Sequence, residues 1–330
     1  MSHLQYPSVS VVVPCYRSAG TLEELVERID ATFDEEGIEY EVILVVDGSP
    51  DDTWKVAETL SARPEVRSLE LMRNYGQHNA LLAGILHAGN EVIVTMDDDL
   101  QHPPEAVPGL LRALMAGKDL VYGVPQEENR SWFRNSTSRI VKRAMAQALN
   151  VGHATSISAF RAFRHEIVPA FERVSDAFVS IDVILSWATT RIGTVVVETD
   201  ARSHGESGYT VRSLVRHTLN MVTGYSIRPL KLVTLLGFLT GLFGFVLLAV
   251  VLFLFFTGRT EVAGFTTLAS MIALFAGAQM TALGVFGEYL GRLHFRSMSR
   301  PAFVIRNDTG PAGPAPTPGG DGPSRTPPPA

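Results

Sequence analysis

Two long uncharged stretches near the C-terminal end constrain the fold of this chain most. Residues 232–258 and 262–287 contain no Asp, Glu, Lys, Arg or His, and each is longer than the roughly 20 residues that a membrane-spanning helix needs. A pair of buried core helices would normally carry a polar face, but the only strongly polar side chain in the second stretch is Gln279. The sequence therefore predicts two transmembrane helices, which the short link 259–261 joins into a helical hairpin.

The charges beside this hairpin predict its orientation. Both flanks of a hairpin lie on the same side of the membrane, and basic residues beside a span favour the cytoplasm. We therefore expect a multi-pass protein of the inner (plasma) membrane whose N-terminal domain and two termini are cytoplasmic. The start of the chain shows no signal-peptide pattern, which fits this orientation. The flanking basic residues are Arg212, Arg216, Arg228, Lys231, Arg292, Arg296 and Arg300.

The overall charge argues against nucleic acid as a partner. The formal net charge is −6, whereas nucleic-acid-binding domains are typically basic. The basic residues concentrate beside the hairpin, which indicates a lipid bilayer as the partner surface. Cys15 is the single cysteine, so the chain cannot form an internal disulfide.

The first two thirds of the chain alternate between short apolar strands and amphipathic helices. Near-continuous apolar strands indicate a sheet that is covered on both faces, and their alternation with helices indicates mostly parallel pairing. Ligands of such sheets bind at the carboxyl ends of the strands. We expect strands at 9–14, 41–46, 91–96, 120–122 and 195–198, and helices at 21–35, 80–87 and 105–115.

These patterns divide the chain into six regions. Residues 210–231 have an apolar face opposite Arg212 and Arg216, as in a helix that lies on a membrane surface. The last residues are rich in Pro and Gly, which predicts a disordered tail. The predicted regions are an α/β domain (1–209), a juxtamembrane amphipathic helix region (210–231), two transmembrane helices (232–258 and 262–287), a cytosolic segment (288–306) and the tail (307–330).

Three consecutive carboxylates, Asp97, Asp98 and Asp99, follow the apolar strand at 91–96. Carboxylates crowded in this way repel one another unless a cation joins them. Mg²⁺ and Mn²⁺ prefer carboxylates together with substrate phosphates to an all-protein cage. The alternative is a solvated acidic turn, but the preceding strand and the closing Pro103–Pro104 pair favour a metal and diphosphate site.

Other polar residues suggest a nucleotide and a second anionic site. Asp47 ends a strand and has a side chain that accepts hydrogen bonds from a base or a ribose, although such turns are also common structural devices. Arg73 precedes a helix and could present a cation to the nucleotide, although a single Arg in a loop is more often simply solvated. Arg134, Arg202 and Ser207 are suited to bind a phosphate. For Arg139, Lys142, Arg212 and Arg216, attraction to anionic lipid headgroups is the preferred interpretation. Together these sites predict a transferase that loads a sugar onto a lipid phosphate.

Several motifs in this order resemble the polyprenyl-phosphate glycosyltransferases, which are family 2 enzymes with a GT-A fold. The resemblance covers nearly everything before Asn307. Its nearest branch is that of the undecaprenyl-phosphate 4-deoxy-4-formamido-L-arabinose transferases, and the dolichyl-phosphate mannose synthases are more distant. The motifs lie at 11–16, 47–49, 73–78, 97–105, 131–134, 205–207 and 287–292.

The resemblance implies a Rossmann-like GT-A domain in the cytosol and a role for each matching residue. It implies inverting, metal-dependent transfer from a UDP- or GDP-sugar to a polyprenyl phosphate, first of all undecaprenyl phosphate, at the cytoplasmic membrane face. The product would be a lipid-linked monosaccharide for modification of a cell-envelope glycan or glycolipid. The implied residues are Asp97, Asp99 and Arg202 for catalysis; Asp97, Asp99 and Gln101 for Mg²⁺ or Mn²⁺; Pro14, Tyr16, Asp47, Arg73, Asp97 and Asp98 for the nucleotide sugar; and Arg134, Arg202 and Ser207 for the acceptor phosphate.

The chain departs from the family pattern at three positions. Val46 stands where the family usually has the first of two Asp, Gly208 replaces a Lys, and Thr155 replaces an Asp that is a proposed general base in part of the family. A phosphate monoester has a second pKa of about 6, so the acceptor is already a nucleophilic dianion at neutral pH. The chemistry therefore survives the loss of this Asp, but the identity of the sugar stays open.

Rival functions fit the sequence less well. A processive polysaccharide synthase carries a Gln-X-X-Arg-Trp motif, and a nicotinamide enzyme carries Gly-X-Gly-X-X-Gly after its first strand; this chain has neither. A non-catalytic membrane scaffold or a lipid-linked sugar translocation partner that retained the fold is the remaining alternative. The intact acidic cluster with Gln101 disfavours it. The nucleotide, the length of the polyprenol and assembly into a homo-oligomer stay open.

Overall fold

The computed structural model describes residues 5–125, 158–172, 179–198, 228–257, 264–297 and 301–310. By their contacts, these residues divide into two compact units. One holds the described residues of Met1–Gly208 and Ser299–Ala330, and the other holds those of Tyr209–Met298. The predicted juxtamembrane helix region lies almost entirely outside the described residues.

Eight strands of the first unit form one mixed sheet among the described residues, in the order β7-β5-β6-β4-β1-β2-β3-β8. The pairs β1–β2, β1–β4, β2–β3 and β5–β7 are parallel, whereas β6 and β8 run antiparallel to their neighbours. The prediction of a mostly parallel α/β sheet is thus confirmed. The strands are β1 (Val9–Cys15), β2 (Tyr40–Val46), β3 (Val66–Leu71), β4 (Val92–Thr95), β5 (Leu120–Pro125), β6 (Arg161–Arg164), β7 (Ile192–Val197) and β8 (Ile305–Asp308).

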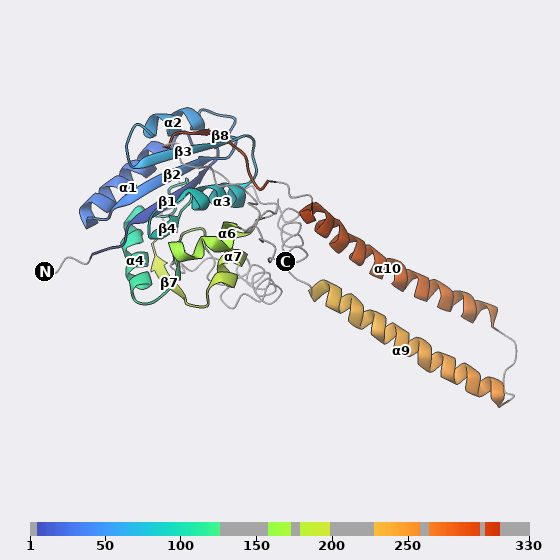
Figure 1. The fold of residues 1–330 in the computed structure, drawn as a ribbon. Helices are drawn as coiled ribbons and strands as arrows, with labels where there is room; N and C mark the ends of the chain where they lie inside the picture. Colours follow the sequence, from blue (N-terminus) through green and yellow to red (C-terminus); the bar gives the residue numbers. More distant parts are fainter. Residues whose placement is uncertain are drawn as a thin grey trace, which may run out of the picture. The chain divides into compact units, whose positions relative to one another are not determined.

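Helices cover both faces of the sheet because successive side chains of each strand point to opposite faces (Figure 1). Val11 and Val13 of β1 pack in one core with α1, α2 and α4, and Val12 packs in the other with α3, α6 and α7. The helices of this unit are α1 (Leu22–Glu36), α2 (Thr53–Leu60), α3 (Gln77–His87), α4 (Val107–Met115), α6 (Pro169–Glu172) and α7 (Ile181–Ala188), with short 3₁₀ turns η1 (Pro104–Ala106) and η3 (His165–Ile167).

The second unit consists of two long helices, α9 (Arg228–Phe256) and α10 (Phe265–Ser297), which pack against each other as an antiparallel pair (Figure 1). Many of their large apolar side chains are exposed, among them Phe238, Phe245 and Phe256. A search of the described residues finds no helix that combines the length and hydropathy of a membrane span.

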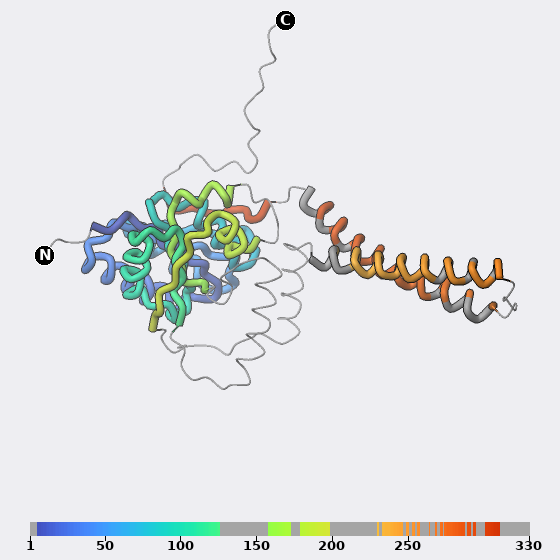
Figure 2. The backbone as a smooth tube through the Cα atoms, turned by 90° about the horizontal axis from the view of Figure 1, so that it is seen from below, coloured from blue at the N-terminus to red at the C-terminus, as the bar shows by residue number. Residues whose placement is uncertain are grey.

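Strand β8 corrects the predicted start of the tail. Asn307 and Asp308, which the sequence analysis assigned to a disordered tail, belong to a strand that pairs with the edge strand β3. Arg67 of β3 donates two hydrogen bonds to the Asp308 carboxylate at 2.9 and 2.7 Å, and Asn307 donates to Glu70 at 2.7 Å. The chain after α10 therefore returns to the sheet, as Figure 2 shows for the red strand.

We expect β8 to stabilise the sheet although it is only four residues long. A chain that ends at Phe303 leaves the edge of β3 unpaired and its Arg67 and Glu70 without the partners that β8 supplies. Several lost hydrogen bonds should lower the unfolding free energy by about 2 kcal/mol or more, which is a fall of roughly 5 °C in Tm. A chain that ends at Gly310 keeps β8 and is the matched control. Thermal unfolding of both chains gives the two Tm values. Equal values would contradict the stabilising role of β8.

Candidate active site

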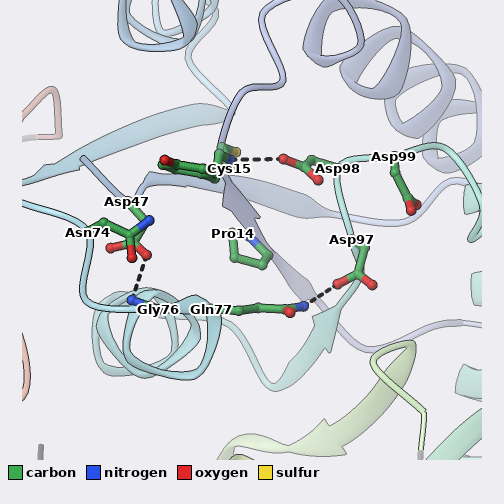
Figure 3. Close-up of a pocket in the computed structure, with 10 residues that line it drawn as sticks. Pro14, Cys15, Asp47, Asn74, Gly76, Gln77, Asp97, Asp98 and Asp99 are labelled. Atoms are coloured by element: carbon green, nitrogen blue, oxygen red, sulfur yellow. Dashed lines mark hydrogen bonds between the residues drawn. The ribbon is translucent and has the colours of Figure 1, made fainter. Parts of the chain in front are cut away.

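A cavity of about 320 Å³ lies at the carboxyl ends of the parallel strands, where ligands of such sheets bind (Figure 3). Its walls come from the end of β1 and from the segments that follow β1, β2, β3 and β4. Four of the lining residues are aspartates, and none of the described lining residues is Lys, Arg or His. The lining residues are Pro14, Cys15, Tyr16, Asp47, Asn74, Gly76, Gln77, Asp97, Asp98 and Asp99.

Asp97, Asp98 and Asp99 form a turn after β4, which we call the acidic turn. Their carboxylates point in three directions. Asp97 points across the cavity toward Gln77 (Figure 3). Asp98 accepts a hydrogen bond from the Tyr16 N–H at 3.1 Å, and Asp99 accepts one from the Gln101 side chain at 2.6 Å. Leu100 takes a left-handed conformation with φ 61°, which reverses the chain between Asp99 and Gln101. The turn thus places Asp97 and Asp99 along the cavity and turns Asp98 toward β1.

Burial and local partners set the charge of this turn. Burial raises the pKa of Asp98, while hydrogen bonds from Ser18 and Tyr16 act in the opposite direction. His102 lies behind the turn, where burial lowers its pKa and favours the neutral imidazole. The ring of His102 stacks on Phe160, and its Nδ1 is 3.3 Å from the Asp97 backbone nitrogen. A neutral acceptor therefore supports the backbone of Asp97.

The oxygen ligands at this site fit a divalent cation whose remaining coordination positions are filled by a substrate. Among the described residues, no three His, Cys, Asp or Glu side chains converge to form a complete metal site. Mg²⁺ characteristically keeps several waters and binds through one or two carboxylates plus phosphate oxygens. Asp97 and Asp99 supply two carboxylates that line the cavity. These residues therefore fit the predicted Mg²⁺ or Mn²⁺.

Asp47 lies in the wall of the cavity opposite Asp97 and fixes the loop that forms this wall. Its two carboxylate oxygens accept hydrogen bonds from the backbone N–H groups of Tyr75 and Gly76, each at 2.7 Å. Burial raises the pKa of Asp47, whereas these two N–H groups and Arg73 lower it. The predicted contact between Asp47 and a nucleobase stays a prediction. The structure shows that the same carboxylate orders the loop between β3 and α3, which we call the donor loop (residues 73–76).

Gly48 permits the donor loop to approach the end of β2. Its φ is +55°, and a Cβ atom on it would lie 2.4 Å from the backbone carbonyl carbon of Arg73 and 2.5 Å from the Asn74 nitrogen. Only glycine fits both this conformation and this spacing. Arg73 places its guanidinium over the Tyr75 ring, 4.3 Å from the centroid, and does not line the cavity.

A buried polar network supports the acidic turn from the neighbouring strands. Arg161 of β6 is 1% exposed, forms an ion pair with Asp182 at the start of α7, and donates to the Thr95 hydroxyl at 3.0 Å. Thr95 ends β4 and in turn donates to the Ala159 carbonyl at 2.7 Å. Tyr122 donates to the same carboxylate of Asp182 at 3.2 Å. These contacts hold residues 159–161 beside β4, the strand that precedes Asp97.

The structure brings most of the predicted donor and metal residues together. Pro14, Tyr16, Asp47 and Asp97–Asp99 line one cavity, and Gln101 contacts Asp99. The predicted acceptor residues Arg134, Arg202 and Ser207 lie outside the described residues, as does Thr155. Sequence reasoning missed four lining residues. Three of them, Asn74, Gly76 and Gln77, adjoin Arg73 in a motif from which only Arg73 was selected; the fourth is Cys15.

Residues 10–170 match glycosyl transferase family 2. The chain belongs to this family and is a glycosyltransferase, as its motifs predicted.

Curated relatives cover almost the whole chain. The undecaprenyl-phosphate 4-deoxy-4-formamido-L-arabinose transferase of Edwardsiella ictaluri is 32% identical over 303 residues, which is 91% of this chain and 93% of that protein. The enzyme of the same name from Enterobacter sp. is 32% identical over 302 residues, 90% of this chain and 92% of its own. The crystal structure of mannosyl-3-phosphoglycerate synthase from Rubrobacter xylanophilus matches with a TM-score of 0.50 at 16% identity, over 68% of this chain and 75% of that one, which supports the fold alone.

Proposed function

We propose that this protein transfers a sugar, with inversion, from a nucleoside-diphosphate sugar to a polyprenyl phosphate, first of all undecaprenyl phosphate. The observation that supports the donor and the metal is the strand-end cavity, whose lining includes Asp47, Asp97, Asp98 and Asp99. Mg²⁺ binds through one or two carboxylates together with substrate phosphate oxygens, so this lining suits a nucleoside diphosphate with its cation. The names of the two relatives support an undecaprenyl phosphate acceptor.

Different residues around the cavity are proposed to bind the cation and the nucleotide sugar. Asp97 and Asp99 hold Mg²⁺ or Mn²⁺, with Gln101 beside Asp99. The bound cation supplies positive charge to the leaving diphosphate. Asp47 keeps the donor loop against the end of β2 through two backbone hydrogen bonds, so the nucleotide meets a wall that is already ordered. Pro14 and Tyr16 form the wall contributed by β1 and the segment after it.

The acceptor supplies its own nucleophile. Its phosphate is mostly a dianion above about pH 6, so attack on the anomeric carbon needs no protein base. Arg134, Arg202 and Ser207 are proposed to bind this phosphate, on the strength of the family motifs that they match. Thr155, in place of the family Asp, is then part of the sugar pocket.

We further propose that α9 and α10 form a transmembrane hairpin and that the catalytic domain faces the cytoplasm. Support comes from the two uncharged stretches of the sequence and from the exposed apolar side chains of both helices. The basic residues on both flanks favour the cytoplasmic side. An acceptor anchored in the bilayer and a donor dissolved in the cytosol would then meet on one membrane face.

A topology assay tests this arrangement. A reporter fused between Arg259 and Glu261 should be extracytoplasmic, and one fused at Ala330 should be cytoplasmic, because the basic flanks hold both ends of the hairpin inside. A matched fusion after Pro64, in the exposed turn between α2 and β3, reports the side of the catalytic domain. An extracytoplasmic reporter at Pro64 would separate the donor site from cytosolic nucleotide sugars and overturn the proposal.

A transfer assay tests the reaction itself. The purified full chain is incubated with undecaprenyl phosphate and a panel of UDP- and GDP-sugars, and both the lipid-linked sugar and the released nucleoside diphosphate are measured. We expect one nucleotide to be accepted, chelation of divalent cations to stop transfer, and Mn²⁺ or Mg²⁺ to restore it. Donor and metal binding without transfer to any polyprenyl phosphate would favour the non-catalytic alternative.

A further inference from the structure

One side chain crosses the cavity between its two walls. Gln77 is the first residue of α3 and directly follows the donor loop, and its Nε2 donates a hydrogen bond to Asp97 Oδ1 at 2.6 Å (Figure 3). An ionised carboxylate only accepts hydrogen bonds, so it is the NH₂ end of the amide that faces Asp97. The first residue after the donor loop is thereby hydrogen-bonded to the turn that carries Asp97.

The charge of the group that donates this hydrogen bond affects how well Asp97 can bind a metal ion. Asp97 lies beside Asp98 and Asp99, and a hydrogen bond to an ionised acceptor is about twice as strong as a neutral one. The amide of Gln77 stabilises the carboxylate but carries no net charge. A Lys at this position would supply the same hydrogen bond and also neutralise the cluster, so it would compete with a divalent cation.

The position of Gln77 is itself fixed by the donor loop. Asp47 accepts the N–H groups of Tyr75 and Gly76, and Gln77 is the next residue along the chain. Gly76 has φ +93°, which starts α3 at this point and directs Gln77 toward the end of β4. The order of the donor loop therefore determines where the amide meets Asp97.

We propose that Gln77 is a positioning residue that orients Asp97 for the divalent cation and links the donor loop to the metal site. This inference rests on the metal dependence in the proposed function. Gln77 acts through Asp97, because the amide holds one carboxylate oxygen while the carboxylate keeps the charge and lone pairs that a cation needs. The proposal predicts that a change of Gln77 alters the affinity for the metal ion even when no nucleotide sugar is present.

The test is a Mn²⁺ titration of the purified full chain without nucleotide, in which free Mn²⁺ is followed by electron paramagnetic resonance. Gln77→Met keeps the length of the side chain and removes the hydrogen bond, so Mn²⁺ should bind about tenfold more weakly. Gln77→Lys keeps a hydrogen-bond donor and adds a charge, so affinity should fall by at least about a hundredfold while Tm stays equal or rises.

Gln5→Met and Gln5→Lys are the matched controls, because Gln5 is exposed and precedes β1 at the end of the strand that is remote from the cavity. Both should bind Mn²⁺ like the wild type. If Gln77→Met also bound it like the wild type, the positioning role would be overturned while the proposed function stood. Wild-type binding by Gln77→Lys would overturn the argument that the hydrogen-bond donor at this position must be uncharged. A wild-type protein that binds no Mn²⁺, with or without UDP or GDP, would instead overturn the proposed metal dependence.

Discussion

Replacement of Asp99 by Asn is expected to lower the rate of sugar transfer by roughly a thousandfold, because a cation that binds the leaving diphosphate is worth several kcal/mol in the transition state. Asn preserves the size of the side chain but removes the negative charge beside the cavity. The substitution also disturbs the hydrogen bond that the Gln101 side chain donates to Asp99 at 2.6 Å, since an amide nitrogen cannot accept it. The measurement is kcat and donor KM at saturating Mn²⁺.

A surface carboxylate provides the control for this substitution. Asp52 precedes α2 and pairs with Lys55 in solvent, so Asp52→Asn should leave transfer unchanged. Excess Mn²⁺ should restore little activity to Asp99→Asn, whereas it should fully restore the wild type after chelation. Transfer by the wild type at its normal rate in excess chelator would disprove the metal role of Asp99.

The parts of the fold that local pattern determines were predictable from the sequence. The apolar runs of β1, β2 and β4 alternate with amphipathic helices, and the acidic turn follows β4 directly, so both the sheet and one end of the cavity follow from hydrophobic periodicity. Strand β3 carries Arg67 and Glu70 among its apolar residues and was not predicted. Both side chains serve as partners of β8.

Non-local contacts explain what the sequence did not reveal. Ile305–Asp308 contains three polar residues in four, and its strand exists only because the distant β3 offers a free edge. The contact between Gln77 and Asp97 likewise depends on how α3 packs on β1 and β2. A strand-end Asp such as Asp47 is recognisable in the sequence, but whether its oxygens face a ligand or a neighbouring loop depends on the tertiary structure.

Gly48→Ala should reduce kcat/KM for the donor on the order of a hundredfold, because a displacement of about 1 Å in a substrate-positioning segment has an effect of that size. The new methyl group would lie 2.4 Å from the Arg73 carbonyl carbon and 2.5 Å from the Asn74 nitrogen. Both atoms belong to the backbone, so no side-chain rotation relieves the contact. The donor loop must shift, and with it the N–H groups that bind Asp47.

Gly37→Ala separates this effect from backbone strain. Gly37 has φ +65°, close to the +55° of Gly48, but a Cβ atom there meets nothing within 4 Å. Both substitutions should therefore lose about 1 kcal/mol of stability for the left-handed conformation, and only Gly48→Ala should also lose donor binding. The comparison requires Tm, donor KM and kcat for both variants. Equal kinetics in the two would show that the close approach of Gly48 to the donor loop has no part in binding the nucleotide sugar.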